Sequence, residues 1–246
     1  MKQVLITGAT SGIGQQLALN YAAQGYQVWA CGRNQEKLTA LSQQSPHIQS
    51  LAFDATQREQ VLAAAQQLND PLDLVILNAG NSRYIDDALH FDSLLFEDLI
   101  RTNLLSVAYC LEAFNAKIKQ GGQLALMGSS AAFFPFTRAE AYGSSKAAIN
   151  YLASCLSVDL KAHQIDVSLI TPGFVKTPLT DKNDFPMPCL VAVTEASRII
   201  RAGLAAGQHQ IHFPRRFIWL LRLLGALPVG LWLRLGRSLL SKGRSL

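Results

Sequence analysis

The chain has 246 residues, of which 49% are hydrophobic and 16% are charged. This composition is typical of one globular domain with a large core and excludes a disordered chain. The formal net charge is +5, and four scattered cysteines without a CxxC pair exclude a disulfide framework or a zinc site as the organising feature.

Short apolar segments alternate with longer helix-compatible segments from the N-terminus onward. The predicted strands are residues 4–6, 27–30, 49–53, 72–77, 123–127 and 166–170, and the predicted helices are residues 14–24, 35–44, 57–68, 96–119 and 141–163. Strands that are apolar nearly throughout are typical of a parallel sheet covered on both faces. The pattern therefore predicts one α/β domain over residues 1–207, with a doubly wound parallel sheet. The proline-rich residues 171–188 are predicted to form a loop.

A glycine-rich turn follows the first predicted strand and opens the first predicted helix. The segment reads Thr7-Gly8-Ala9-Thr10-Ser11-Gly12-Ile13-Gly14. Glycines permit a tight turn and let backbone N–H groups approach a pyrophosphate, which the positive end of the following helix also favours. We therefore expect a dinucleotide site formed by Gly8, Thr10, Ser11, Gly12, Ile13 and Gly14.

The end of the second predicted strand bears on the choice of dinucleotide. An acidic residue there would bind a free ribose 2′-hydroxyl, but this chain has Gly32-Arg33-Asn34 instead. Arg33 offers a fork of donors suited to a 2′-phosphate. The segment favours NADP(H) over NAD(H), with NAD(H) kept as a second cofactor; the alternative is that Arg33 is only a solvated loop residue.

Tyr142 and Lys146 stand four residues apart near the start of a predicted helix, so they project from one face. A tyrosine with its usual pKa of about 10 is a poor base near neutral pH. We expect the Lys146 ammonium and an oxidised nicotinamide to lower the pKa of Tyr142, so that its phenol exchanges a proton with substrate.

Taken together and in order, these motifs resemble the short-chain dehydrogenase/reductase family. The resemblance rests on the T-G-x-x-x-G-x-G spacing, Asn78-Ala79-Gly80, Asn103, Tyr142-x-x-x-Lys146 and Pro172-Gly173, over about three-quarters of the chain. It implies a Rossmann fold and an NAD(P)(H)-dependent oxidoreductase that acts on a carbonyl or an alcohol.

The resemblance also implies roles for particular residues. It assigns Ser129, thirteen residues before Tyr142, to the substrate oxygen, whereas alignment on the serine pair would select Ser130. It assigns Asn103 to a water in the proton relay, the alternative being a buried amide satisfied by backbone. It assigns further contacts with the cofactor to Asp54, Ala55, Asn78, Ala79, Gly80, Tyr142, Lys146, Pro172, Gly173, Val175 and Thr177. Asp54 could instead cap the helix that follows it.

Residues 208–246 lie beyond the family pattern and are predicted to be a helical extension that is both basic and apolar. From Gly207 onward there are seven Lys or Arg and no Asp or Glu. Leucines and tryptophans interspersed with arginine are typical of a helix lying in an anionic membrane surface. The alternative is that these helices pack over the substrate pocket or a partner subunit, with arginines reaching water. No nucleic-acid-binding motif is present, so nucleic acid is not an expected partner.

These features predict a carbonyl reductase or alcohol dehydrogenase with a hydrophobic substrate, since the loop residues 133–136 and 188–193 are largely apolar. The competing hypothesis is a catalytically silent NADP-binding sensor or scaffold. We expect a homodimer or homotetramer with no metal. The sequence shows neither a signal peptide nor an apolar run of about 18 residues, so the expected location is the cytoplasm or the inner face of a membrane.

Overall fold

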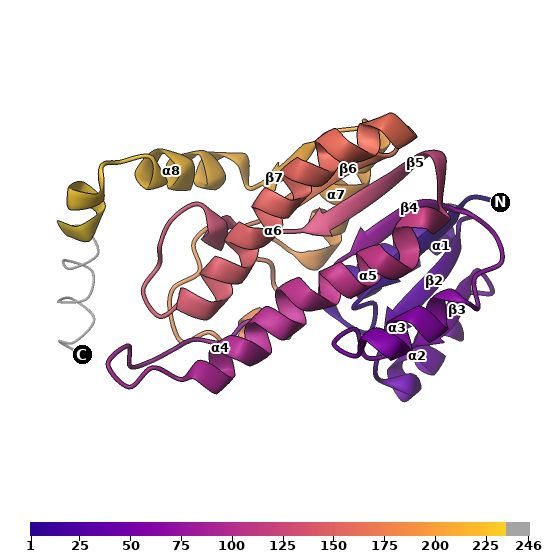
Figure 1. Cartoon of the computed structure of the whole chain (residues 1–246), viewed down its shortest axis with the longest axis horizontal. Coiled ribbons are helices and arrows are strands. Elements are labelled where there is room, and N and C mark those ends of the chain that lie inside the picture. The colour runs from indigo at the N-terminus through magenta and orange to yellow at the C-terminus, as the bar shows by residue number, and fades with distance from the viewer. Residues whose placement is uncertain (235–246) are drawn as a thin grey trace.

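The computed structural model describes residues 1–234 and contains a seven-stranded parallel sheet with helices on both faces (Figure 1). The sheet order is β3-β2-β1-β4-β5-β6-β7. The strands are β1 Gln3–Thr7, β2 Gln27–Gly32, β3 Ile48–Ala52, β4 Leu72–Leu77, β5 Ile118–Met127, β6 Asp166–Pro172 and β7 Gln210–Phe213. The α-helices are α1 Gly12–Ala23, α2 Gln35–Ser42, α3 Arg58–Ala65, α4 Ser93–Ile100, α5 Ser106–Phe114, α6 Glu140–Asp159, α7 Val193–Ala205 and α8 Arg215–Gly225.

Two hydrophobic layers cover the sheet. Successive strand residues point to opposite faces, so Ile6 packs with α1, α2 and α7 while its neighbour Leu5 packs with α3, α5 and α6. Leu5 and Ile6 are both fully buried. This explains why the strands are apolar nearly throughout: each has to match a helical layer on both sides.

The strand order places β1 beside β4, and the chain leaves these two strands in opposite directions across the sheet. A crevice at the carboxyl ends of the strands is the usual ligand position at such a switch point. The glycine-rich turn follows β1 and Asn78-Ala79-Gly80 follows β4, so both motifs lie at this edge.

The structure confirms the six predicted strands and adds a seventh, β7. The sheet therefore continues past residue 207, where the sequence analysis placed the start of a helical extension. The strand is only four residues long and alternates polar and apolar side chains, because one of its faces is partly open. The rest of the expected extension, residues 235–246, lies outside the described residues.

The prediction of a single helix over residues 96–119 is wrong at both ends, because the helical segment runs from Ser93 to Lys117. The helical segment begins at Ser93, where the Asp92 side chain accepts a hydrogen bond from the Leu95 N–H. It passes through a π-helical turn, Arg101–Leu105, and a short 3₁₀ turn, Asn115–Lys117, before β5 starts at Ile118. The polar residues at the start of β5 conceal that strand from a search for apolar runs.

No helix within residues 1–234 combines the length and the apolar composition needed to cross a bilayer. Over the same residues, no group of three His, Cys, Asp or Glu side chains is placed to hold a metal ion. All four cysteines are free, Cys31 and Cys110 in the core and Cys155 and Cys189 at the surface.

Candidate active site

The glycine-rich turn folds tightly against the end of β4. Gly8 has a φ of +66°, and a Cβ there would lie 2.9 Å from the Ala79 Cα. A Cβ on Gly14 would lie only 2.3 Å from the Gly8 carbonyl oxygen. Any larger residue at either position would force the turn apart, so these glycines set the shape of the crevice.

The amino end of α1 offers unpaired backbone donors at this crevice. Its N-cap residue, the exposed Ser11, makes no side-chain capping bond, so its hydroxyl and the first N–H groups of the helix remain available. A Cβ on Gly12, whose φ is +55°, would lie 3.2 Å from Thr177 Cγ2. The turn and the Thr177 segment thus face each other closely, with Ile13 packed down onto the core. This arrangement fits a pyrophosphate held by backbone N–H groups.

The end of β2 lies next to the same turn. A Cβ on Gly32 would lie 2.8 Å from Thr10 Cγ2, so Thr10 occupies the space that a larger residue would need. Arg33 is exposed and forms no ion pair with any acidic residue in the described part of the chain. Its guanidinium is therefore free to meet a phosphate. The Asn34 side chain is occupied differently, because its Oδ1 accepts a hydrogen bond of 2.8 Å from the Lys37 N–H and caps α2.

Asp54 lies beyond β3 and does not cap α3, whose N-cap is Gln57. Its carboxylate accepts hydrogen bonds from the Thr56 N–H at 2.9 Å and from the Thr56 hydroxyl at 2.8 Å, which fixes a local turn. Ala55 packs against the core beneath it. The helix-capping alternative for Asp54 is thus wrong, because the cap of α3 lies three residues further along the chain at Gln57.

Hydrogen bonds tie the end of β4 to the end of β1. The Asn78 side chain donates to the Thr7 carbonyl at 2.9 Å, and the N–H groups of Asn78 and Ala79 donate to the Thr7 hydroxyl. A Cβ on Gly80 would lie 3.4 Å from Lys146 Nζ. The residue after Ala79 must therefore be small for the lysine to reach this edge of the sheet.

Lys146 is buried, with 4% of its surface exposed, and projects from α6 toward the carboxyl ends of the strands. Its ammonium donates a hydrogen bond of 2.9 Å to the Met127 carbonyl and lies 5.9 Å from the centre of the Tyr142 ring. Burial disfavours the charged form and lowers the pKa of Lys146 to about 8.

The pKa of Tyr142 departs from expectation in this structure. Burial of the phenol raises its pKa, and the nearby Tyr84 hydroxyl adds to the rise, while a hydrogen bond with Ser129 acts in the opposite direction. Lys146 does not contribute to this shift, and the predicted lowering also requires an oxidised nicotinamide. With its pKa raised, Tyr142 is protonated at neutral pH.

Of the two candidate serines, Ser129 is the one whose side chain acts on Tyr142, where it lowers the pKa of the phenol. Its hydroxyl also accepts a bond of 3.2 Å from the Ala131 N–H, which fixes its orientation at the end of β5. Ser130 is buried and begins the short 3₁₀ turn after it.

Asn103 is fully buried in the π-helical turn between α4 and α5. Its Oδ1 accepts from the Asn81 N–H at 2.8 Å, and its Nδ2 donates to the Asn81 carbonyl at 2.9 Å and to the Ser145 hydroxyl at 3.0 Å. The amide thus fixes the backbone just after Gly80 to the helix that carries Tyr142. Helical turns of the π type are frequent at functional sites.

Pro172 ends β6 in a buried position, and the chain then passes beneath α8. A Cβ on Gly173 would lie 3.1 Å from Phe217 Cδ1, so α8 covers this segment directly. Val175 is buried and bridges to Val191. Gly173 is therefore held beneath α8, and Val175 is held by its bridge to Val191.

An aromatic group that begins at Tyr84, close to Tyr142, is not among the site residues predicted from the sequence. Tyr84 contacts Phe185 edge-on at 5.4 Å, and its hydroxyl donates to Asn183 Oδ1 at 3.1 Å. Phe174 lies 6.1 Å from Phe185 and 5.9 Å from Phe217 of α8. These side chains come from segments far apart in sequence, and no local motif marks them.

Arg138 joins three of the surrounding loops. It forms ion pairs with Asp86 and Asp184, and its guanidinium lies 5.5 Å from the centre of the Tyr84 ring. Its φ is +66°, which is uncommon for a residue with a side chain. The contacts hold the loops after β4, β5 and β6 together above Tyr142.

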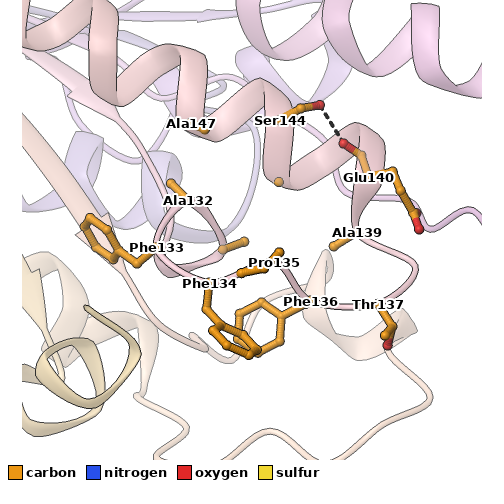
Figure 2. A pocket seen from close by; sticks show the side chains of 12 residues that line it. Ala132, Phe133, Phe134, Pro135, Phe136, Thr137, Ala139, Glu140, Ser144 and Ala147 are labelled. Atoms are coloured by element: carbon orange, nitrogen blue, oxygen red, sulfur yellow. Dashed lines mark hydrogen bonds between the residues drawn. The ribbon is translucent and has the colours of Figure 1, made fainter. Parts of the chain in front are cut away.

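A cavity of about 480 Å³ lies beside the loop after β5 and the start of α6 (Figure 2). Phe133, Phe134 and Phe136 line it, together with Ser144 and Ala147 on the helix. Among the described residues that line it, none belongs to the expected catalytic set. Ser144, which lines it, is two residues from both Tyr142 and Lys146 and therefore lies on roughly the opposite side of α6 from them.

A doubly wound parallel sheet with a glycine turn at its switch point, and with a partly buried Tyr142 beside a buried Lys146, defines a dinucleotide-binding α/β protein. The short chain dehydrogenase family matches residues 2–186, and the chain belongs to that family.

An uncharacterized oxidoreductase of Myxococcus xanthus is 31% identical over 239 residues, covering 92% of this chain and 93% of the relative. Serine 3-dehydrogenase of Agrobacterium fabrum is 32% identical over 184 residues, covering 72% of this chain and 73% of that enzyme. The crystal structure of a short chain dehydrogenase from Burkholderia cenocepacia in complex with NADP has a TM-score of 0.83 and 26% identity, and the likeness covers 96% of this chain and 99% of that one.

Proposed function

We propose that this protein is an NADP(H)-dependent carbonyl reductase or alcohol dehydrogenase with Tyr142 as its proton-transfer residue. The observation that carries the proposal is the convergence of the Ser129 and Tyr142 hydroxyls at the carboxyl ends of the strands, with Lys146 buried beside them. Two hydroxyls close enough for one to act on the pKa of the other can share one substrate oxygen between them. That is the arrangement needed to polarise a carbonyl.

In the reductive direction, the chain's own residues handle the oxygen and its proton. Bound NADPH would supply the hydride to the carbonyl carbon. Ser129 donates a hydrogen bond to the carbonyl oxygen, and the Tyr142 phenol transfers its proton to that oxygen as negative charge develops there. The Lys146 ammonium, whose Nζ lies 5.9 Å from the ring centre, stabilises the phenolate that remains.

Asn103 and Arg33 have supporting roles in this proposal. Asn103 holds the backbone after Gly80 against α6, which keeps the Lys146 side chain at the crevice. The free guanidinium of Arg33 is suited to the 2′-phosphate of NADP(H), and the end of β2 has no carboxylate to favour a free 2′-hydroxyl. The NADP complex of the Burkholderia relative supports the same cofactor.

The aromatic group of Tyr84, Phe174, Phe185 and Phe217 supports a substrate with a hydrophobic portion. Serine, the substrate named for the Agrobacterium relative, is small and polar. Hydrophobic walls with a few polar groups that fix orientation are typical of sites for larger organic ligands. We therefore expect faster reduction of long-chain or aromatic aldehydes and ketones by NADPH than oxidation of serine by NADP⁺.

A spectrophotometric screen tests the proposal. Oxidation of NADPH is followed with short, long-chain and aromatic carbonyls, and reduction of NADP⁺ is followed with the matching alcohols and with serine. Tyr142→Phe is expected to lower turnover about 10²- to 10⁴-fold while leaving NADPH binding intact. Tyr26→Phe is the matched control, because Tyr26 precedes β2 at the edge of the sheet opposite the carboxyl ends of the strands.

Two results would count against the mechanism. Full turnover by Tyr142→Phe would remove the phenol from the chemistry. Binding of NADPH without turnover of any compound would instead favour the cofactor-binding sensor or scaffold.

We further propose that the protein is a homodimer or homotetramer in which α5 and α6 meet their counterparts. Tyr151 and Val158 of α6 are each about three-quarters exposed, and Leu105 before α5 is also exposed. An apolar stripe of this kind is costly in water and suits a self-complementary interface. Light scattering on Val158→Asp would show a lower mass than on the unaltered protein, and an unchanged mass would contradict this arrangement.

A further inference from the structure

Helix α8 has two apolar sides, and only one of them packs on the protein. Ile218 and Leu221 are buried against the domain. Trp219, Leu220 and Leu223 point away from it and are 68%, 51% and 66% exposed. Side chains of this size lose a favourable burial free energy when they remain in water, so this side of α8 needs another occupant.

The exposed side continues beyond α8. Residues 229–234 are again helical, and Val229 and Leu231 are exposed there. Figure 1 shows α8 and this turn projecting from the body of the molecule, at the end opposite the N-terminus. We call Trp219, Leu220, Leu223, Val229 and Leu231 the tail face.

Positive charge without negative charge surrounds the tail face. Arg215 and Arg216 are exposed at the start of α8 and, like Arg234, form no ion pair with any acidic residue in the described part of the chain. From residue 207 to the C-terminus the sequence has seven Lys or Arg and no Asp or Glu, while the remainder has a slight negative excess.

We propose that the tail face docks on an anionic lipid surface, with α8 lying in the plane of the membrane. Exposed tryptophan and leucine beside arginine are the combination that places a helix at the boundary between headgroups and acyl chains. A second copy of the same face is a poorer occupant, because self-pairing would bring unpaired arginines from both copies together.

The inward side of α8 is suited to hold the helix firmly while it is docked. Arg222 lies 4.6 Å from the centre of the Phe133 ring and donates to Gln210 Oε1 at 3.0 Å. Phe217 packs on Gly173 and Phe174. The tail face is therefore carried by a helix that is packed on the domain, and not by a free tail.

Co-sedimentation of the full-length protein with vesicles tests the proposal. Truncation before residue 208 is unsuitable, because it would remove β7 from the sheet. Vesicles of equal phosphatidylglycerol and phosphatidylcholine are compared with vesicles of phosphatidylcholine alone. We expect binding to the first and at least tenfold weaker binding to the second.

Two double variants separate the contributions of apolar contact and charge. Trp219→Gln with Leu223→Gln should weaken binding to the anionic vesicles at least tenfold. Arg215→Gln with Arg216→Gln should weaken it roughly fivefold per arginine, and 0.5 M salt should largely remove the difference between the two vesicle types. Leu89→Gln with Leu94→Gln is the matched control, since both leucines are more than three-quarters exposed on another part of the surface, and it should bind as the unaltered protein does.

Equal sedimentation of the unaltered protein with and without anionic vesicles would overturn the proposal. Anionic vesicles that bind the Trp219 and Leu223 double variant as well as the unaltered protein would also overturn it. A third contrary result would be that the unaltered protein binds no vesicles while the double variant has a lower oligomeric mass by light scattering. Thermal unfolding checks that each variant is folded; if the apolar variant is not, the arginine variant and the salt series decide the question. None of these measurements depends on enzymatic turnover.

Discussion

The burial of Lys146 predicts a specific dependence of stability on pH. Its pKa is lowered from 10.5 to about 8 in the folded chain, and each pKa unit corresponds to 1.36 kcal/mol. Below pH 8 the side chain is charged in both the folded and the unfolded states, so the folded protein bears a cost of about 3 kcal/mol. Between pH 8 and 10.5 the folded state loses this proton while the unfolded state keeps it, so the cost falls as pH rises.

The variant Lys146→Met should remove this dependence. Urea unfolding of both proteins without cofactor, at several pH values from 7 to 10, gives the difference in free energy of unfolding between them. Other titrating groups cancel in that difference, and loss of the bond to the Met127 carbonyl shifts it equally at every pH. The unaltered protein should gain about 2 kcal/mol relative to the variant between pH 7 and pH 10. A constant difference, or a change of opposite sign, would refute a lowered pKa for the buried ammonium.

Two further predictions concern the cofactor crevice. Arg33→Ser should raise the KM for NADPH about 10- to 100-fold and leave the KM for NADH nearly unchanged, because only the 2′-phosphate loses a charge-assisted hydrogen bond. Steady-state kinetics that show equal changes in the KM of both cofactors would exclude this role of Arg33. Gly14→Ala should lower the free energy of unfolding by about 1–3 kcal/mol or more and abolish NADPH binding, since its Cβ would lie 2.3 Å from the Gly8 carbonyl oxygen. Gly230→Ala is the control, as a Cβ there meets nothing within 4 Å; similar unfolding curves for both variants would show that the turn can adapt.

The central fold was predictable because its signals are local. Each buried parallel strand must be apolar on both faces, which makes it visible as a short run such as Leu72–Leu77. Strand β7 escaped detection because its alternating Gln210-Ile211-His212-Phe213 pattern is brief and lies in a segment dominated by its basic and apolar composition. The early start of β5 was concealed by polar residues between Ile118 and Leu124.

The candidate site was predictable only where spacing or a turn fixes the geometry. The glycine turn and the Tyr142–Lys146 pair have such spacing, and the structure brings them to one edge of the sheet. Tyr84, Phe185 and Arg138 meet only through long-range contacts between loops, which no window of sequence contains. The direction of the Tyr142 pKa shift depends first on burial of the phenol, and spacing along a helix does not determine burial.

Only Pro214 separates the last residue of the edge strand β7 from the first residue of α8. So short a connection is rigid and does not act as a flexible linker. A protein held by a flexible linker tumbles and presents every side to the bilayer in turn, whereas this connection would fix the tilt and height of the sheet above the lipid. Every bound copy would then hold its crevice at the same distance from the membrane. The distance that a membrane-embedded carbonyl can extend from the lipid, rather than its affinity for the site, would decide whether it reaches Tyr142.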